Sequence, residues 1–339
     1  LSPAKTEALP SVPTFLFDPG CFVFILRRVS GTDTQPISAA TRYCAVYGHP
    51  IRHSASPALQ NAGIAALGLD WRYLAFEVHP DDLKAAIAGA QAMKFIGLNL
   101  TLPHKLLAVE MVDVLDASAQ TWGAVNTIRF EARDKNGGWQ PLHQFPEPDI
   151  REMRSQGFNT DADALVRSLR EDLGCNLSGA TVLLLGAGGA GRAAALKLAA
   201  DGVSRLFLVN RTASRAEELR EEIRRRFPKV RAEIGYPTIP VDLVLNATSL
   251  GLKNDDALPL DESRFNLRNA RAVYDMIYRP AETRLLQAAE SAGCRAANGL
   301  GMLLYQGTKA LEMWSGRPAP VEVMRQALER HIYGAGPKH

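Results

Sequence analysis

The stretch ATVLLLGAGGAG, residues 180–191, joins a mostly apolar run to a glycine-rich turn. Gly186, Gly188 and Gly191 match the spacing G-x-G-x-x-G, directly after a predicted strand and before a predicted helix. In such a turn the first glycine allows a tight bend, the second lets the backbone approach a pyrophosphate, and the third lets helix and strand pack closely. The helix N-terminus adds N–H groups and partial positive charge. The stretch therefore favours a dinucleotide-binding β-α-β unit.

Two other interpretations of the glycine-rich turn are weaker. A loop of the type G-x-x-x-x-G-K-[ST] does not fit, because Arg192 and Ala193 replace the lysine and the magnesium-binding hydroxyl. A loop that only turns the chain would not need a strand before it and a helix after it. We therefore predict that a dinucleotide contacts the whole turn: Gly186, Ala187, Gly188, Gly189, Ala190 and Gly191.

The end of the next predicted strand indicates which dinucleotide is bound. About 20 residues after the glycines, an NAD-binding fold places an acidic residue on the ribose 2′-hydroxyl. The sequence there is NRT, residues 210–212, with no acid. Arg211 and Arg215 can bind a 2′-phosphate, and Arg211 can also stack on adenine. Asn210 and Thr212 can donate hydrogen bonds to the same phosphate, so NADP is favoured over NAD. A solvated helix start capped by Thr212 is the alternative, and it leaves both arginines unexplained.

Composition narrows the class of protein. The 339 residues are 46% hydrophobic and carry a net charge of only +3, which favours two domains and argues against a nucleic-acid or membrane partner. The four cysteines form no C-x-x-C pair and the seven histidines show no metal-site spacing, so we expect no disulfide framework and no metal. No apolar run is long enough to span a bilayer, and Arg27 and Arg28 follow the early apolar run instead of preceding it. We expect a cytoplasmic protein.

Strands and helices alternate on both sides of a long polar stretch. Before it we predict strands at 43–47, 71–78, 95–100 and 124–130, with helices at 56–67, 81–92 and 103–115. Residues 131–156 are interpreted as an insertion or an extended hairpin. After it we predict strands at 180–185, 205–209, 241–245 and 272–276, helices at 190–201 and 213–226, and a helical segment from 283 almost to the end. The fold class is therefore α/β with mainly parallel sheet and helices on both faces.

Several short stretches resemble one family, the shikimate dehydrogenases. They are HSASP at 53–57, NLTLPHK at 99–105, GAVNT at 123–127, GFNTD at 157–161, the glycine-rich turn, NRT at 210–212, NATS at 246–249, residues 278–286, and GML at 301–303 with Gln306. Their order matches the family from Tyr43 to the C-terminal helices. The resemblance implies reversible, NADP-dependent reduction of 3-dehydroshikimate to shikimate, a step of chorismate and aromatic amino-acid biosynthesis.

The resemblance also implies a domain organisation. Residues 43–160 would form an α/β substrate-binding domain and residues 161–298 a Rossmann NADP-binding domain. The helices of residues 299–339 would return to the substrate domain. Residues 1–42 are expected to be a loosely structured extension, with 22–26 as a possible added strand.

A lysine and an aspartate suit the implied reaction. Oxidation of a secondary alcohol requires a proton to leave the hydroxyl while hydride moves to the nicotinamide. Lys105 follows a strand, where ligands gather in an open α/β sheet, and Asp161 lies at the junction of the two modules. By resemblance they are the catalytic pair, with Lys105 as general acid/base or transition-state stabiliser and Asp161 as its partner and substrate anchor. Coupled groups titrate as a unit, so the division of labour stays open.

Further site residues are implied by the resemblance. On the substrate side, Ser54 and Ser56 would hold the carboxylate, Asn99, Thr101, Asn126 and Gln306 would bind ring hydroxyls, and Tyr278 would support the carboxylate end. On the cofactor side, Thr248 and Ser249 follow a strand and can approach the nicotinamide, and the resemblance adds Met276, Gly299 and Met302. Each has a purely structural alternative when taken singly: a helix cap at Ser56, strand-end turns at Asn99, Asn126 and Thr248, and a packed helix face at Met302 and Gln306.

Three positions depart from the family pattern. Asn298 stands where the family usually has aspartate, Gln60 where it usually has histidine, and Ala164 where glycine is frequent. None of them is Lys105 or Asp161, so the departures leave the catalytic pair intact.

Three alternatives stay open. The first is a quinate/shikimate dehydrogenase of broader specificity, against which Ser54, Ser56 and the arginine-bearing turn argue modestly. The second is a catalytically silent ligand sensor, against which Lys105 and Asp161 argue. The third is one part of a multifunctional enzyme. We expect a monomer or a homodimer that binds small molecules.

Overall fold

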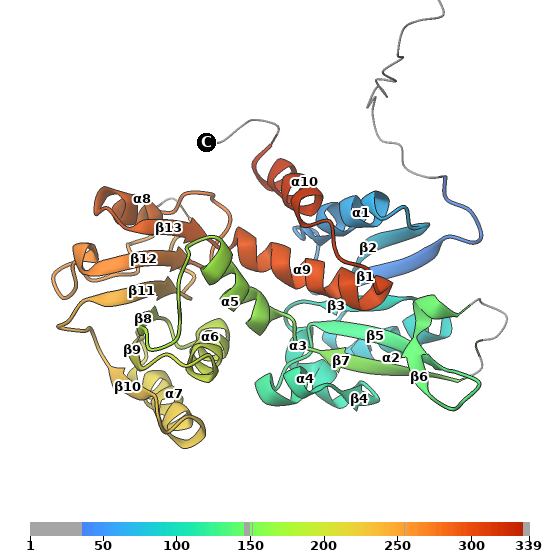
Figure 1. The fold of residues 1–339 in the computed structure, drawn as a ribbon, viewed down its shortest axis with the longest axis horizontal. Helices are drawn as coiled ribbons and strands as arrows, with labels where there is room; N and C mark the ends of the chain where they lie inside the picture. The colour runs from blue at the N-terminus through green and yellow to red at the C-terminus, as the bar shows by residue number, and fades with distance from the viewer. Residues whose placement is uncertain (1–35, 146–149, 151, 254, 335–339) are drawn as a thin grey trace, which may run out of the picture. The chain divides into compact units, whose positions relative to one another are not determined.

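The structure is a computed structural model that describes residues 36–145, 150, 152–253 and 255–334. Its strands form two sheets, one of seven strands and one of six (Figure 1). The α/β fold class expected from the sequence is confirmed. The added strand expected at residues 22–26 lies outside the described residues. None of the helices in the described part of the chain is long and apolar enough to cross a membrane.

The first sheet is mixed, with strand order β2-β1-β3-β5-β7-β4 and β6 paired to β5. Its strands are β1 (Arg42–Gly48), β2 (Trp71–Glu77), β3 (Gly97–Leu100), β4 (Val114–Leu115), β5 (Thr127–Arg133), β6 (Trp139–Pro141) and β7 (Met153–Phe158). Strand β1 runs parallel to β2 and β3, whereas β5 runs antiparallel to β3, β6 and β7. The helices between these strands are α1 (Ser56–Ala66), α2 (Leu83–Ala92), α3 (His104–Leu107) and α4 (Ala117–Trp122).

The second sheet is parallel throughout, in the order β10-β9-β8-β11-β12-β13. Its strands are β8 (Thr181–Leu185), β9 (Arg205–Val209), β10 (Arg231–Ile234), β11 (Val241–Asn246), β12 (Ala270–Asp275) and β13 (Arg295–Asn298). The intervening helices are α6 (Gly189–Ala200), α7 (Ala213–Arg226) and α8 (Arg284–Ser291). The order reverses between β8 and β11, and such a switch point is where open α/β sheets bind ligands.

Three more helices connect the two sheets. They are α5 (Asp161–Glu171), α9 (Leu300–Ser315) and α10 (Val321–Tyr333). Helix α5 packs against α6 and α9, and α9 and α10 both pack against α1 (Figure 1). The domain boundaries expected at residues 160 and 298 fall just before α5 and at the end of β13, and the division into two domains stays a prediction.

The helix expected over residues 103–115 is wrong. Helix α3 ends at Leu107, a 3-10 turn follows, and Val114 and Leu115 pair with β7 as strand β4. The tertiary contacts of Asp113 explain the difference, because its carboxylate accepts hydrogen bonds from both the backbone N–H and the hydroxyl of Ser155, each at 2.7 Å. These contacts capture the chain as an edge strand, and residues 117–122 form a separate helix.

Two short strands of the second sheet were missed, and one of the two interpretations of residues 131–156 is confirmed. Strand β13 interrupts the helical segment expected after residue 283, and β10 forms the far edge of the second sheet. Both have four residues, too few to show a clear pattern. Strands β5 and β6 form an antiparallel pair around a turn with Gly137 at a φ of 84°. The alternative of an extended hairpin is therefore confirmed for the described part of residues 131–156.

One close approach locks α9 onto the first sheet. Trp314 of α9 is fully buried, and its indole N–H donates to the Ile128 carbonyl at 3.0 Å. A side chain at Gly97 of β3 would meet the Trp314 Nε1 atom and lie 2.6 Å from that carbonyl oxygen. Gly97 therefore gives Trp314 room to reach the strand.

We predict that Gly97→Ala lowers the free energy of unfolding by about 2–4 kcal/mol, because the methyl group overpacks the core and breaks the indole hydrogen bond. Gly89→Ala in α2 is the matched control, since a methyl group there meets no atom within 4 Å. It should be neutral or stabilise by up to about 1 kcal/mol. Urea unfolding of both variants measures the difference, and equal stabilities would contradict this account of the α9 contact.

Candidate active site

A cavity of about 390 Å³ opens at the carboxyl ends of β1 and β3. Segments from both sheets and α9 line it. It brings together eleven of the predicted site residues: Ser54, Ser56, Asn99, Thr101, Lys105, Asp161, Met276, Tyr278, Gly299, Met302 and Gln306. Residues predicted to bind the substrate and residues predicted to bind the cofactor, although far apart in the sequence, thus line the same cavity.

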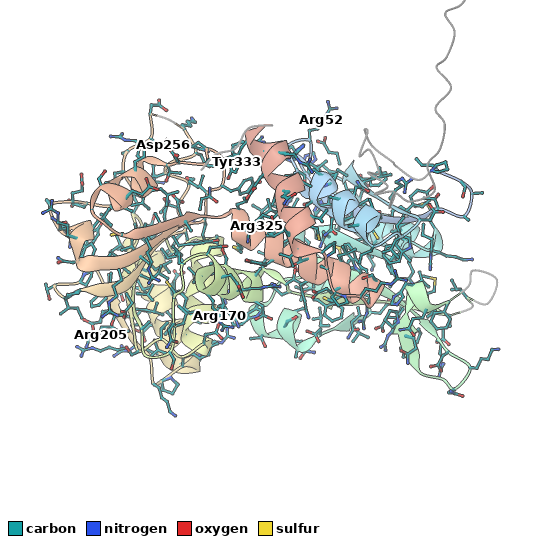
Figure 2. The ribbon with its side chains drawn as sticks, turned by 45° about the horizontal axis from the view of Figure 1, so that its top comes forward. Arg52, Arg170, Arg205, Asp256, Arg325 and Tyr333 are labelled. Carbon is teal, nitrogen blue, oxygen red and sulfur yellow. The ribbon has the colours of Figure 1, made fainter. Side chains whose placement is uncertain are left out.

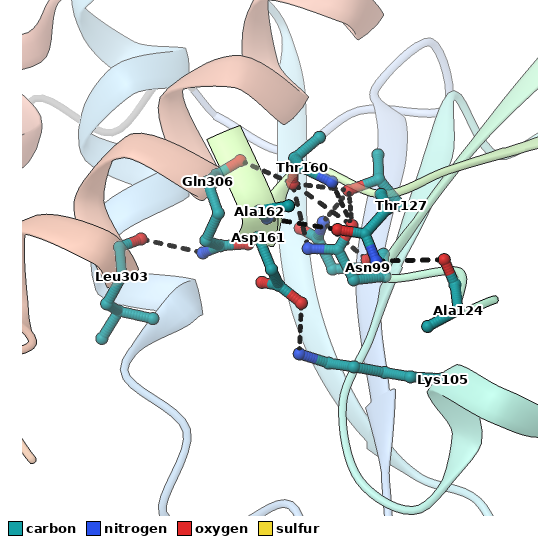
Figure 3. Close-up of polar contacts among 11 residues, drawn as sticks. Asn99, Lys105, Ala124, Thr127, Thr160, Asp161, Ala162, Leu303 and Gln306 are labelled. Carbon is teal, nitrogen blue, oxygen red and sulfur yellow. Dashed lines mark hydrogen bonds and ion pairs between the residues drawn. The ribbon is translucent and has the colours of Figure 1, made fainter. Parts of the chain in front are cut away.

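Lys105 and Asp161 form an ion pair at this cavity. The Lys105 Nζ atom donates to Asp161 Oδ2 at 2.8 Å (Figure 3). The two side chains are 27% and 21% exposed, so the pair is partly shielded but open to a ligand. An ammonium beside a carboxylate in such a place can bind a hydroxyl or carbonyl oxygen and exchange a proton with it.

Local structure places the two charges. Lys105 lies in the single turn of α3, and its own carbonyl accepts a hydrogen bond from the Val125 N–H at 2.8 Å. Asp161 is the first residue of α5, where a carboxylate is favoured by the helix dipole. Both positions are therefore set by the backbone of helix ends rather than by long side chains alone.

Behind the ion pair lies a buried polar network. The Asn126 carboxamide accepts from the Thr160 N–H at 2.8 Å and donates to the Thr160 hydroxyl at 3.0 Å. The Asn99 amide donates to the Thr127 hydroxyl at 3.0 Å (Figure 3). The Tyr73 hydroxyl donates to Asn99 Oδ1 at 2.7 Å. Asn126 is 1% exposed and is not among the residues that line the cavity. Its ring-hydroxyl contact stays a prediction, whereas its hold on the residue before Asp161 is visible.

Some of the contributing residues were missed by the sequence reasoning. Thr127 and Thr160 belong to the GAVNT and GFNTD stretches, but only their neighbours were singled out. His53, which the sequence reasoning did not assign to the site, lines the cavity next to Ser54. The available signal was adjacency within the same motifs, which does not tell which way a side chain points.

The N-terminus of α1 opens on the cavity. Ser54, Ala55 and Ser56 all line it. Ser56 is the first helical residue and Ala55 occupies the cap without a side-chain hydrogen bond, so the alternative of Ser56 as a helix cap is wrong. The Ser54 hydroxyl accepts a hydrogen bond from the Ser56 N–H at 3.3 Å. Hydroxyls and helix N–H groups at one place are typical of a site for an anionic group such as a carboxylate.

The remaining substrate-side residues come from the second sheet and α9. Tyr278 follows β12 and is half-buried. The Gln306 side-chain amide donates to the Leu303 carbonyl of its own helix at 2.8 Å, and the Gln306 backbone carbonyl accepts from the Thr160 hydroxyl at 3.3 Å. Gln306 thus lies in the cavity wall and also contacts the network behind Asp161.

The glycine-rich turn has room for a pyrophosphate on its outer side. Gly186 has a φ of 102°, and a side chain at Gly191 would clash with the Gly186 carbonyl oxygen. A side chain at Gly188 or Gly189 would meet no atom within 4 Å, at the point where α6 begins. Asn210 braces the turn by accepting from the Ala187 N–H at 2.9 Å. The turn is therefore closed on the protein side and open toward a ligand, as a dinucleotide requires.

Two cations stand free beyond the end of β9. Arg211 and Arg215 are exposed, and neither guanidinium has an ion pair or hydrogen bond with the described parts of the chain. Thr212 precedes α7, but its side chain makes no capping bond, so the alternative of a capped helix start is not supported. Asn210 is partly used, because its amide donates to the Thr212 carbonyl at 2.8 Å. The free cations fit an extra phosphate near the turn.

The ends of β11 and β12 are held by a buried aspartate. Asp275 is fully buried and accepts from Asn246 at 3.0 Å and from Thr283 at 2.7 Å. Burial raises the pKa of this carboxyl. The Thr248 hydroxyl donates to Asn246 Oδ1 at 2.8 Å, whereas Ser249 is exposed. Neither Thr248 nor Ser249 is among the residues that line the cavity, and their nicotinamide contact stays a prediction.

Two of the departures from the family pattern have visible partners. Gln60 is fully buried and donates to the Gly307 carbonyl at 2.9 Å, so it ties α1 to α9. The Asn298 side chain makes hydrogen bonds with the Ala281 carbonyl, the Tyr333 hydroxyl and the Leu300 N–H. Among the described residues, no group of three or more His, Cys, Asp or Glu side chains is arranged to hold a metal ion.

We predict that Gly191→Ala lowers the free energy of unfolding by about 2–3 kcal/mol and weakens dinucleotide binding, because a backbone oxygen cannot swing away from the new methyl group. Gly189→Ala, which has open space around it, is the control and should melt within a few degrees of the parent. Thermal melting and a dinucleotide titration check both. A Gly191→Ala protein that melted like Gly189→Ala would refute the close packing inferred for the turn.

Comparisons with known proteins show which family the chain matches. The chain matches the shikimate dehydrogenase substrate binding domain over residues 46–128, the shikimate / quinate 5-dehydrogenase family over residues 168–249, and the shikimate 5′-dehydrogenase C-terminal domain over residues 299–329. A curated shikimate dehydrogenase (NADP(+)) from Methanopyrus kandleri is 40% identical over 304 residues, which cover 87% of this chain and 98% of that protein.

Solved structures of similar fold include two activities. Shikimate 5-dehydrogenase from Thermus thermophilus, in complex with NADP(H) and shikimate, has a TM-score of 0.69 and 34% identity, covering 85% of this chain and 99% of that one. The ligand-free 5-ketofructose reductase of Gluconobacter sp. strain CHM43 has a TM-score of 0.73 and 32% identity, covering 87% and 100%. On the identity and coverage of these matches, the chain belongs to the shikimate dehydrogenase family.

Proposed function

We propose that this protein is an NADP-dependent shikimate dehydrogenase that interconverts 3-dehydroshikimate and shikimate. The observation that carries the proposal is the Lys105–Asp161 ion pair, 2.8 Å long, in a cavity lined from both sheets. The curated relative from Methanopyrus kandleri bears the same activity in its name and matches across most of this chain. The family context and the site chemistry therefore point to one reaction.

The residues around the glycine-rich turn fit the cofactor. Gly188, Gly189 and the N-terminus of α6 would hold the pyrophosphate, and Arg211 with Arg215 would hold the 2′-phosphate. When bound, NADP(H) supplies the hydride acceptor or donor. Met276, Gly299 and Met302 line the substrate cavity from the second sheet and α9, on the side where the nicotinamide would lie.

Lys105 is the group that moves the proton. Its ammonium faces the cavity and is paired with the Asp161 carboxylate, so it can donate a hydrogen bond to a substrate carbonyl oxygen. As negative charge grows on that oxygen, the ammonium stabilises it and transfers a proton, giving the alcohol. In the opposite direction Lys105 accepts the hydroxyl proton. Asp161 holds the ammonium in place and offers an acceptor for a neighbouring hydroxyl.

The rest of the cavity orients the substrate. Ser54, Ser56 and the α1 N-terminus would bind the carboxylate, with Tyr278 near the same end. Asn99, Thr101 and Gln306 present polar groups that can bind ring hydroxyls. Tyr73 and Thr127 keep the Asn99 amide in one orientation. The wall is therefore suited to a small polyhydroxylated acid.

The proposal is tested by steady-state oxidation of shikimate with NADP, followed at the absorbance of the reduced nicotinamide. The parent protein should turn over, and Lys105→Ala should lose about 10²- to 10⁴-fold in kcat, because the proton donor is removed. Lys309→Ala, an exposed lysine of α9, is the control and should keep its rate. Full activity in Lys105→Ala would show that the mechanism is wrong.

Cofactor choice is tested separately. The double variant Arg211→Ala/Arg215→Ala should lose about 10-fold or more in kcat/KM for NADP, because charge-assisted bonds to the 2′-phosphate are lost. Its kcat/KM for NAD should change less than about twofold, since NAD carries no such phosphate. Arg268→Ala removes an exposed arginine from a turn before β12 and should alter neither value. An equal loss of kcat/KM with both cofactors would contradict the proposal that Arg211 and Arg215 bind the 2′-phosphate.

A second activity is worth measuring because the matched family includes quinate dehydrogenases. The ratio of kcat/KM for shikimate over quinate distinguishes a dedicated enzyme from one of broader specificity. A monomer or homodimer in the cytoplasm remains our prediction for its state and location.

A further inference from the structure

The last residue of α10, Tyr333, contacts a residue in the wall of the substrate cavity. The Tyr333 hydroxyl donates to the Tyr278 carbonyl at 2.8 Å, although 55 positions separate the two residues. Arg279, next to Tyr278, makes a second bond to the same helix end by donating to the Ile332 carbonyl at 3.3 Å. Tyr333 lies at the end of α10 (Figure 2). The C-terminal helix therefore contacts the segment that carries Tyr278.

A third residue determines which way the Tyr333 hydroxyl points. Asn298 ends β13, and its Oδ1 atom accepts from the Leu300 N–H at 3.0 Å. Its amide nitrogen donates to the Ala281 carbonyl at 2.9 Å. A backbone N–H can only donate and a carbonyl can only accept, so the orientation of the Asn298 carboxamide is determined without ambiguity. The atom that faces Tyr333 Oη, at 3.1 Å, is therefore the amide nitrogen.

The donor and acceptor directions of these hydrogen bonds determine where the hydrogen of the Tyr333 hydroxyl goes. A tyrosine hydroxyl has one hydrogen to donate. Because Asn298 donates to Tyr333, the hydrogen of Tyr333 is left for the Tyr278 carbonyl. A carboxylate at position 298 would accept that hydrogen and leave the Tyr278 carbonyl without its donor. Burial raises the pKa of Tyr333, which keeps the hydroxyl protonated.

We propose that Asn298 and Tyr333 are positioning residues that hold the Tyr278 segment in the wall of the substrate site. Neither residue is among those that line the substrate cavity, whereas Tyr278 is. Their effect is passed on through Tyr278, which lines the cavity near the expected carboxylate end. The inference rests on the proposed function for its substrate, and on the hydrogen bonds alone for its geometry.

Backbone contacts between residues 298–299 and residues 276–278 explain how a change at Asn298 can move Tyr278. The Gly299 N–H, directly after Asn298, donates to the Ile277 carbonyl at 3.1 Å. A side chain at Gly299 would clash with the Met276 carbonyl oxygen. The segments 276–278 and 298–299 are thus in backbone contact, and a shift of one moves the other.

The test compares Tyr333→Phe, Asn298→Asp and the double variant with the parent protein. Each single variant should raise KM for shikimate about threefold to tenfold, the loss expected for one hydrogen bond, while kcat and KM for NADP change less than about twofold. In the Tyr333→Phe background, Asn298→Asp should raise KM by a smaller factor than in the parent protein, because the bond it redirects is already gone and only the amide bond to the Ala281 carbonyl is still lost. Tyr236→Phe is the matched control. It removes a hydroxyl that accepts one backbone N–H, from Asp261 at 2.9 Å, remote from the cavity.

Other outcomes overturn the inference. An unchanged KM for shikimate in Tyr333→Phe, or effects that add in the double variant, would show that the two residues do not act through Tyr278. A fall in melting temperature with a lower kcat and an unchanged KM would indicate a structural role only. If the parent protein does not turn over shikimate, the proposed function fails. The positioning role is then judged from crystal structures, where a Tyr278 main chain unmoved in Tyr333→Phe would refute it.

Discussion

One ion pair organises the site, and two helix ends deliver its charges. Lys105 comes from a single helical turn after β3, and Asp161 begins the helix that connects the two sheets. Opposite charges attract more strongly where water is partly excluded, but they also lose hydration there, so geometry has to be good for the pair to persist. The hydrogen bonds of Asn126 to Thr160, and of Val125 to the Lys105 carbonyl, provide that geometry.

The cofactor side follows a different principle, in which backbone shape comes first. At Gly186 and Gly191 the chain passes too close to itself for a side chain, whereas Gly188 and Gly189 have open space around them where α6 begins. The side chains that we propose discriminate between dinucleotides follow the next strand, where Arg211 and Arg215 have no protein partner in the described residues. The groups proposed to bind the pyrophosphate and those proposed to bind the 2′-phosphate therefore lie on different segments.

Sequence reasoning succeeded where a pattern is local. The turn at 186–191, strand β9 and helix α7 all lie where expected, because apolar periodicity and glycine spacing act within one segment. It failed at residues 103–115. Ser155, which lies 42 positions further along the chain in β7, donates two hydrogen bonds to Asp113, and the end of the expected helix is an edge strand instead. The bond between the Asn126 amide and the Thr160 hydroxyl was not predicted either, because no local pattern reports a contact between residues 34 positions apart.

The sequence by itself determined the fold class, the dinucleotide turn and the residue types available for catalysis. These depend on short-range chemistry: the freedom of glycine, the period of apolar residues and the charge of each side chain. Only the tertiary structure decided which groups meet. It brings Lys105 to 2.8 Å from Asp161, and it sets Asn298 and Tyr333 behind Tyr278. Hydrogen bonds and ion pairs depend on distance and direction between segments far apart in the chain, and these are set by packing.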